Sequence, residues 1–190
     1  MNPHHVLILP GWHNSDADHW QSRWEAARGY QRVEQHSWIH PLRGDWIARL
    51  EDVLLSLDLE RDGPAVLVAH SLGCLHVGAW AAHSKNTDRV KGALLVAAPD
   101  ADRDDVRQLI PGWAPVHMDR LPFASVLIAS RNDPHCTMDR ARTFAEAWGS
   151  EFVDAGARGH LNSDSGLGDW PEGFEHLQRL QALPASGAAL

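Results

Sequence analysis

The chain has 190 residues, 44% of them hydrophobic and 22% charged, and carries a formal net charge of −8. This composition is typical of a globular protein and excludes a mainly disordered chain. The acidic charge, with no run of Lys or Arg, argues against nucleic-acid binding, because such proteins need a positive face to neutralise phosphates. The length predicts a single domain over residues 1–190.

The sequence gives no sign of secretion or membrane insertion. The apolar run Val6–Leu9 has no basic leader and is too short for a signal peptide or a membrane span. Two cysteines, Cys74 and Cys136, form no CxxC motif and indicate no disulfide framework. We therefore expect a cytoplasmic protein that uses no metal or other cofactor and does not associate with membranes. The sequence does not identify a protein partner.

In the first half of the chain, short apolar runs alternate with helical patterns. Strands are predicted at Val6–Leu9, 32–35 and 64–69, and helices at 18–28, 45–57 and Leu72–His83. Trp20 and Trp24 stand four residues apart, which places them on one helix face. Asp45 is the expected N-cap of the second helix.

The second half continues the alternation after a less regular segment. Strands are predicted at 90–97, 125–130 and Glu151–Asp154, and helices at Met138–Trp148, where Gly149 ends the helix, and at 174–183. Segment 101–121 is polar and broken by prolines, so we expect one short helix and irregular chain there. The tail 184–190 is small and is expected to fray.

This order of elements predicts an α/β fold. Alternating strands and helices form a parallel sheet covered on both faces, here a three-layer sandwich with an open, mostly parallel sheet of about six strands. Ligands bind outside the carboxyl ends of such strands. Segment 101–121 follows a strand at that edge and is long enough for a small flap but too short for a large lid domain.

The segment from Val66 to Leu75 has the pattern of a nucleophile elbow. A buried strand runs into Ala69-His70-Ser71-Leu72-Gly73, and a helix follows. The small residues Ala69 and Gly73 give room for a sharp turn that presents Ser71 above the sheet edge. Ala69 departs from the more usual Gly. The alternative reading of this segment is an ordinary strand-to-helix turn in which Ser71 caps the helix.

A serine nucleophile needs a base, and the base needs an orienting acid. In this architecture the order along the chain is Ser, acid, His. Asp133 follows the strand at 125–130 and is the favoured acid. Asp100, which follows the strand at 90–97, and Asp154 remain competitors, and Asn-Asp-Pro at 132–134 is also ordinary turn chemistry.

Among thirteen histidines, His160 is the expected base because it alone follows the last predicted strand. Glycines before it leave the loop free to direct the imidazole toward Ser71. His70, beside the nucleophile, is expected to line the pocket or to have a structural role, and His135 also lies at a strand end. Five others are expected at the surface: His4, His5, His36, His83 and His176.

The backbone amides of Leu72 and Trp12 are the expected oxyanion donors. Leu72 follows the nucleophile, and Trp12 lies in the loop after the first strand, where Pro10-Gly11 permits a turn. A plain Pro-Gly turn is the alternative there. The substrate pocket is expected to be lined by Trp12, His13, Ser15, His70 and Trp113.

Four pieces of the chain together resemble the retinoblastoma-binding-protein-9/YdeN group of small serine hydrolases. They are Leu9-Pro10-Gly11-Trp12 with His19-Trp20-Gln21-Ser22-Arg23-Trp24-Glu25, then Ala69-His70-Ser71-Leu72-Gly73, then Ser130-Arg131-Asn132-Asp133-Pro134, and Gly159-His160-Leu161-Asn162. The likeness covers most of the chain. The elbow and the His160 piece occur in many α/β hydrolases, whereas the segment around His19 is more specific.

The resemblance implies a compact α/β-hydrolase core without a large lid, a Ser71-Asp133-His160 triad, and activity on small carboxylic esters and possibly amides. A non-catalytic protein-binding module on the same fold is the alternative. A metal-dependent hydrolase is disfavoured, because no HExxH or comparable ligand spacing is present.

Overall fold

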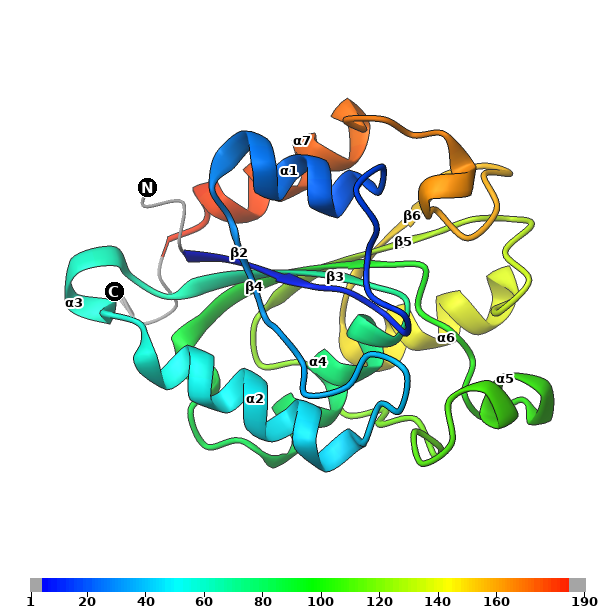
Figure 1. The fold of residues 1–190 in the computed structure, drawn as a ribbon, viewed down its shortest axis with the longest axis horizontal. Coiled ribbons are helices and arrows are strands. Elements are labelled where there is room, and N and C mark those ends of the chain that lie inside the picture. Colours follow the sequence, from blue (N-terminus) through cyan, green and yellow to red (C-terminus); the bar gives the residue numbers. More distant parts are fainter. Residues whose placement is uncertain (1–4, 185–190) are drawn as a thin grey trace.

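A six-stranded sheet, parallel throughout, forms the centre of the computed structural model, which describes residues 5–184 (Figure 1). The strand order across the sheet is β2-β1-β3-β4-β5-β6. The strands are β1 Val6–Leu9, β2 Gln31–Arg32, β3 Ala65–His70, β4 Val90–Val96, β5 Ala124–Ala129 and β6 Glu151–Asp154. The central strands are buried on both faces, which explains why they are continuous apolar runs rather than alternating ones.

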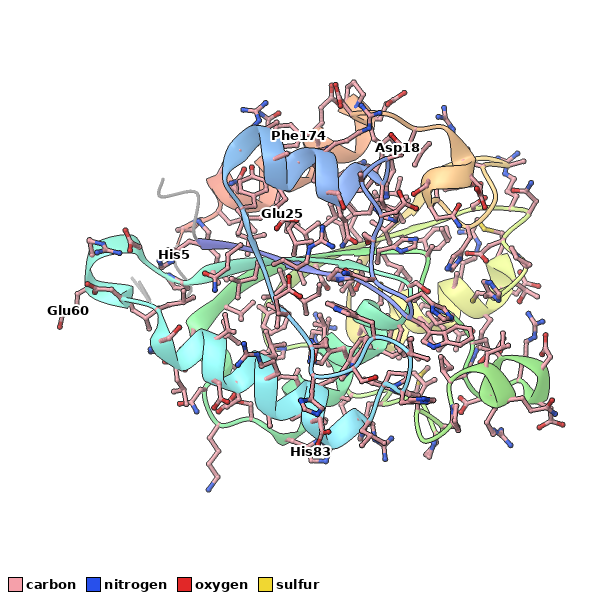
Figure 2. The ribbon with its side chains drawn as sticks, in the orientation of Figure 1. His5, Asp18, Glu25, Glu60, His83 and Phe174 are labelled. Carbon is pink, nitrogen blue, oxygen red and sulfur yellow. The ribbon has the colours of Figure 1, made fainter. Side chains whose placement is uncertain are left out.

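Helices cover both faces of the sheet. They are α1 Trp20–Arg28, α2 Arg43–Ser56, α3 Leu59–Asp62, α4 Leu72–His83, α5 Asp104–Leu109, α6 Met138–Trp148 and α7 Pro171–Ala182. In Figure 1, α1 and α7 lie on one face, and α2, α4 and α6 on the other. Figure 2 shows Phe174 of α7 beside α1, where its ring lies 5.1 Å from that of Trp24. No helix in the described part of the chain is long and apolar enough to cross a membrane.

Alternate residues of β1, β3, β4 and β5 enter different cores. Leu7 and Leu9 pack in the core under α2, α4 and α6, whereas Val6 and Ile8 pack in the core under α1 and α7. The period of two along a strand explains this division. The predicted three-layer α/β sandwich with about six strands and no large lid is therefore confirmed.

The sheet order brings two loops together at the carboxyl ends of the strands. From β1 the chain passes outward to β2, and then returns to place β3 on the other side of β1. Such a reversal opens a crevice between the loops that leave the two strands, and this is the usual ligand site of open α/β sheets. Here the loops are the one that begins at Pro10 and the turn at Ser71.

Several element boundaries differ from the predicted ones. β2 is shorter than expected, and α7 begins at Pro171, three residues before the predicted start. α3 was not expected. The predicted N-cap at Asp45 is wrong: the amide of Trp46 already donates to Leu42 O at 3.1 Å, so α2 begins at Arg43 and Asp45 lies in its first turn.

The surface position predicted for His5 is also wrong. Its side chain is 3% exposed and its Nε2 lies 3.2 Å from a carboxylate oxygen of Asp62, at the end of α3. His36 and His83 are exposed, as expected, and His176 is partly buried. The predicted surface position of His4 and the predicted fraying of 185–190 lie outside the described residues.

Candidate active site

Ser71 occupies a sharp turn between β3 and α4. Its backbone has φ 54° and ψ −124°, a conformation that non-glycine residues rarely adopt. Its amide donates to Val96 O at 2.9 Å, which fixes the turn to the neighbouring strand β4. Such strain at a side chain beside a cavity is typical of a functional site.

Two glycines allow the turn to pack closely against the end of β1. A Cβ atom at Gly73 would lie 2.2 Å from Leu9 O, and one at Gly11 would lie 2.8 Å from the Cβ of Ser71. Real Cβ contacts are never this short, so both positions exclude a side chain. Ala69 is fully buried in β3, where its methyl group is accommodated.

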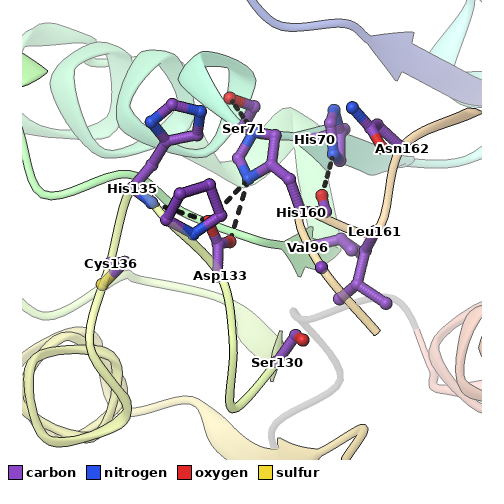
Figure 3. Close-up of polar contacts among 12 residues, drawn as sticks. His70, Ser71, Val96, Ser130, Asp133, His135, Cys136, His160, Leu161 and Asn162 are labelled. Atoms are coloured by element: carbon purple, nitrogen blue, oxygen red, sulfur yellow. Dashed lines mark hydrogen bonds and ion pairs between the residues drawn. The ribbon is translucent and has the colours of Figure 1, made fainter. Parts of the chain in front are cut away.

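Ser71, His160 and Asp133 form a continuous chain of hydrogen bonds (Figure 3). His160 Nε2 lies 2.9 Å from Ser71 Oγ, and His160 Nδ1 lies 3.0 and 2.9 Å from the two carboxylate oxygens of Asp133. Because a carboxylate can only accept, Nδ1 carries the ring proton and Nε2 is left to accept from the serine hydroxyl. The Asp133 side chain is 3% exposed and that of His160 is 13% exposed, so the chain is largely shielded from water.

The two competing acids have other partners. Asp100 Oδ1 accepts from Arg140 Nε at 3.1 Å. Asp154 accepts from Arg131 Nε at 2.9 Å, on the exposed edge of the sheet. Of the three candidates, Asp133 is the one that the structure brings to His160.

The loop that carries His160 is anchored from one side by the loop after β5. Asn132 Oδ1 accepts from the amide of Gly159 at 2.7 Å and from Ser130 Oγ at 3.0 Å. Ser130 Oγ in turn accepts from the amide of Arg158 at 2.9 Å. Asp133 and these anchors therefore belong to the same short segment, which positions both the acid and the histidine loop.

From the other side, two aromatic rings hold the same loop. His70 Nε2 donates to His160 O at 2.9 Å, and Trp20 Nε1 donates to Leu161 O at 2.8 Å. His70 therefore has the structural role expected for it and also lines the cavity. Sequence reasoning missed the contributions of Trp20 and Asn132, although both lie in the segments on which the family resemblance depends.

Neutral histidines surround His160. The rings of His135 and His70 lie 4.6 and 5.0 Å from it, centroid to centroid. Burial lowers the pKa of both, and places that of His70 well below its ordinary value. Neutral neighbours do not compete with His160 for the carboxylate of Asp133.

The loop that carries Trp12 packs against Leu72, the residue of the other expected oxyanion donor. The Cβ position of Gly11 is 3.2 Å from the amide nitrogen of Leu72, so the loop of Trp12 runs directly against the start of α4. Within the described residues, neither the Leu72 nor the Trp12 amide has a hydrogen-bond acceptor, whereas the next amide, of His13, donates to Trp38 O at 3.0 Å. The Trp12 side chain is fixed separately, because its Nε1 donates to Ile39 O at 3.0 Å.

A cavity of about 220 Å³ opens at Ser71 and His160. Of the expected pocket residues, Trp12, His13 and His70 line it. Six further lining residues were not predicted: Asn14, Asp16, His19, Asn162, Ser163 and Asp164. His19 belongs to the motif at 19–25 and Asn162 to the piece at 159–162, whereas the other four are common turn residues with no distinguishing sequence signal.

Two expected pocket residues are turned away from this cavity. Trp113 is 1% exposed and its Nε1 donates to Pro41 O at 2.7 Å, so the ring is part of the core beside Trp46. Ser15 is 7% exposed and donates through Oγ to Gln21 Oε1 at 2.7 Å. Segment 101–121 contributes no residue to the cavity walls.

Neither cysteine is placed to act as a nucleophile. Both are buried and free, and burial raises the pKa of Cys136 to about 12 and that of Cys74 further. Such thiols stay protonated and inert at neutral pH. Among residues 5–184, no group of three or more His, Cys, Asp or Glu side chains could hold a metal ion.

The sheet order, the strained Ser71 between strand and helix, and the contacts of Ser71 with His160 define an α/β-hydrolase. A model of the serine hydrolase family matches residues 6–179, and the chain belongs to that family. No curated protein matches the chain.

Solved structures of other hydrolases are similar to this chain. A YdeN-like hydrolase from Pectobacterium atrosepticum is 30% identical, with 92% of this chain and 89% of that one covered and a TM-score of 0.79. The YdeN protein of Bacillus subtilis is 20% identical over 94% of this chain and 98% of its own, with a TM-score of 0.74. Est1E from Butyrivibrio proteoclasticus, with bound ferulic acid, is 12% identical, with 94% of this chain and 89% of that one covered and a TM-score of 0.70. The last two likenesses concern the fold alone. The resemblance to small YdeN-type serine hydrolases is confirmed.

Proposed function

We propose that this protein hydrolyses small carboxylic esters, with amides as a second class of substrate, through an acyl-enzyme on Ser71. The observation that carries the proposal is the hydrogen-bonded chain from Ser71 Oγ through His160 to Asp133. A serine hydroxyl is a weak nucleophile at neutral pH, and an adjacent oriented imidazole is the usual means of activating it.

In the first half of the reaction, His160 Nε2 takes the hydroxyl proton while Ser71 Oγ bonds to the acyl carbon. The carbonyl oxygen becomes an oxyanion that the amides of Leu72 and Trp12 stabilise. As this intermediate collapses, the bond to the alcohol oxygen breaks, and that oxygen receives the proton from His160. The acyl group is then esterified to Ser71.

In the second half, water repeats the attack. His160 takes a proton from the water as its oxygen bonds to the acyl carbon, and then returns the proton to Ser71 Oγ as the acid leaves. Asp133 remains ionised, fixes the His160 tautomer and stabilises the imidazolium in both halves. The reaction requires no cofactor and no metal ion.

The cavity at Ser71 itself is small, and a second hollow of about 720 Å³ shares His160, Asn162 and Asp164 with it. A volume of about 220 Å³ lies below the usual range of drug-sized pockets, about 300 to 1,000 Å³. Both cysteines are free, buried thiols, which is consistent with the cytoplasmic setting that we also propose.

Labelling with a fluorophosphonate probe tests the nucleophile. We expect wild-type protein to be labelled at Ser71 and Ser71→Ala to be unlabelled. Ser84→Ala changes a hydroxyl at the other end of α4 and should label normally. Activity on a panel of short-chain esters should fall by at least about 10⁴-fold in Ser71→Ala. Labelling of a different serine in folded protein would overturn the proposal.

The same experiment separates the enzyme from the protein-binding alternative. Labelling of Ser71 without turnover of any ester or amide in a broad panel would contradict the hydrolase proposal and favour a binding module. Turnover that depends on Ser71 would contradict the binding module as the main role.

A further inference from the structure

His19 occupies the N-terminus of α1 and lines the cavity at Ser71. Its Nδ1 accepts from the amide of Gln21 at 3.1 Å, and so caps the helix. The residue is 3% exposed. Its ring lies 4.6 Å, centroid to centroid, from that of His70, the residue before Ser71. The hydrolase reaction as described above gives His19 no role.

The capping bond determines where the imidazole carries its proton. Because Nδ1 accepts from a backbone amide, it has no proton of its own. Burial lowers the pKa of His19 to about 4, so the ring is neutral at physiological pH. The single ring proton is therefore on Nε2.

This Nε2–H group has no acceptor. The atom is buried, and no hydrogen-bond partner exists for it among the described residues. Buried donors in native proteins are almost always paired, because an unpaired one loses its hydration without compensation. The side chain that carries this donor lines the cavity that contains the nucleophile, and the missing acceptor is explained if the substrate supplies it there.

The other walls indicate what kind of acceptor this is. Two carboxylates line the cavity, those of Asp16 and Asp164, and no Lys or Arg does. Asp16 lies close to His19, whose amide donates to its Oδ1 at 3.1 Å. An anionic substrate group would be repelled here. A hydroxyl group is neutral, accepts one hydrogen bond and can donate another.

We propose that His19 binds a hydroxyl group of the substrate through its Nε2–H, and so makes the enzyme selective for hydroxylated small esters. The inference rests on the proposed function, since it names the substrate class of the same site. The hydroxyl belongs either to the acyl part or to the alcohol part of the ester, and the chemistry of recognition is the same in both.

Two matched pairs of esters test the inference and separate these sources. The acyl pair is ethyl butyrate and ethyl 3-hydroxybutyrate, and the alcohol pair is ethyl butyrate and 2-hydroxyethyl butyrate. In wild-type protein we expect kcat/KM to favour the hydroxylated ester by at least about tenfold in one pair or in both. The pair that shows the preference locates the hydroxyl.

His19→Asn is the variant of choice. Asn is among the best N-cap residues, so it can still accept from the amide of Gln21, but it lacks the Nε2–H group of the imidazole. We expect its preference to fall to about onefold, because the variant loses more kcat/KM on the hydroxylated ester than on ethyl butyrate. His83→Asn, on the exposed end of α4, should keep the wild-type preference. His19→Ser, a second capping residue, replaces His19→Asn if the latter does not fold.

The outcomes distinguish the two proposals. If wild-type protein cleaves none of these esters through Ser71, the proposed function fails. If it cleaves ethyl butyrate but shows no preference in either pair, the inference about His19 is wrong and the proposed function stands. The inference is equally wrong if His19→Asn retains the preference, or lowers activity on both members of a pair alike.

Discussion

The turn that carries Ser71 and the loop that carries His160 reach the same cavity by different means. The Ser71 turn is held by its own backbone and by close packing: its amide bonds to Val96 O, and Gly73 lies against Leu9 O. The His160 loop is held by side chains from distant segments, with donors or acceptors from Trp20, His70 and Asn132. The Ser71 turn therefore depends on residues without a side chain that would clash. The His160 loop depends on side chains long enough to form hydrogen bonds with it.

This difference teaches where each side is vulnerable. Additional atoms should damage the Ser71 turn, because its neighbours are backbone atoms that cannot move aside. Loss of a single polar atom should damage the His160 loop, because each hydrogen bond restrains the position of the base. The following variants examine the two sides in turn, beginning with the largest expected effect.

Asp133→Asn should cause the largest loss. Its Oδ1 can still accept from the amide of His135, as in the native chain, which turns its new NH₂ group toward His160 Nδ1. Two donors would then face each other, and the imidazole would have to adopt the tautomer that protonates Nε2. We expect kcat on a short-chain ester to fall by about 10⁴-fold with the fold intact by circular dichroism.

The competing acids provide the controls. Asp100→Asn and Asp154→Asn alter acids that pair with Arg140 and Arg131 instead. Neither should change kcat by more than about threefold, an effect below 1 kcal/mol. A larger loss in Asp100→Asn than in Asp133→Asn would show that the acid has been assigned to the wrong residue.

Gly73→Ala should cause the next largest effect, on the Ser71 side. The added methyl group would lie 2.2 Å from Leu9 O and would force the turn away from β1. We expect a loss of about 3 kcal/mol or more in the free energy of unfolding in urea, together with loss of activity.

Gly78→Ala is the matched change in the same helix. Its Cβ would meet nothing closer than 3.7 Å, an ordinary contact, and Ala is the better helix former. The stability of this variant should stay within about 1 kcal/mol of wild type. If the two variants unfold alike, close packing does not hold the Ser71 turn.

Buried histidines on both sides make stability depend on pH. Burial lowers the pKa of His76, in α4 behind Ser71, and that of His19 beside the His160 loop, from 6.5 to about 4 in each case. Between about pH 4 and pH 6.5, these two histidines are therefore protonated in the unfolded chain but neutral in the folded protein. Stability is fully present above about pH 6.5 and falls as the pH approaches 4, by up to about 2 kcal/mol for each histidine at about pH 5.

Urea unfolding at about pH 7 and pH 5 measures this loss. His76→Leu should reduce it by up to about 2 kcal/mol, because one proton-linked group is gone. His83→Leu, at the exposed end of the same helix, should leave it unchanged. An identical loss in both variants would contradict the assignment to buried His76.

The Ser71 side was largely predictable from sequence, and the reason is that its signals are contiguous. A buried apolar strand, small residues two before and two after a serine, and a helix all lie between Val66 and His83. The continuous apolar runs likewise predicted the strands, because parallel strands covered on both faces carry no polar side. The helix α3 was not predicted, because its four mostly polar residues are too few to show a helical hydrophobic pattern. The burial of His5 was missed for the same reason, since His5 contacts Asp62 in that helix.

The His160 side was predictable only in its order along the chain. Order favoured Asp133 over two other acids but did not exclude them, since Asp100 follows a strand and Asp154 ends one. Trp113 was expected beside the cavity from its position in a proline-broken segment, yet its indole reaches Pro41 O in the core. Hydrogen bonds between residues more than a hundred positions apart, such as Trp20 to Leu161, leave no local pattern to read.

The smallest expected effect isolates one such long-range bond. Trp20→Phe removes the Nε1–H that donates to Leu161 O at 2.8 Å, next to the base. Trp24→Phe removes an equivalent donor one turn further along α1, where Nε1 donates to Asp169 O at 2.7 Å, away from the base. Both indoles are at least 97% buried, since Trp20 is 1% and Trp24 3% exposed, so the two substitutions lose similar volume from one core.

Trp20→Phe should therefore lower kcat by about tenfold, equivalent to about 1.4 kcal/mol, whereas Trp24→Phe should leave kcat within about twofold. Both should lose similar stability in urea. This split between activity and stability identifies Trp20 as a positioning residue for His160, because a purely structural tryptophan would affect the two measurements as Trp24 does. Equal kcat values in the two variants would mean that the contacts with His70 and Asn132 alone hold the base in place.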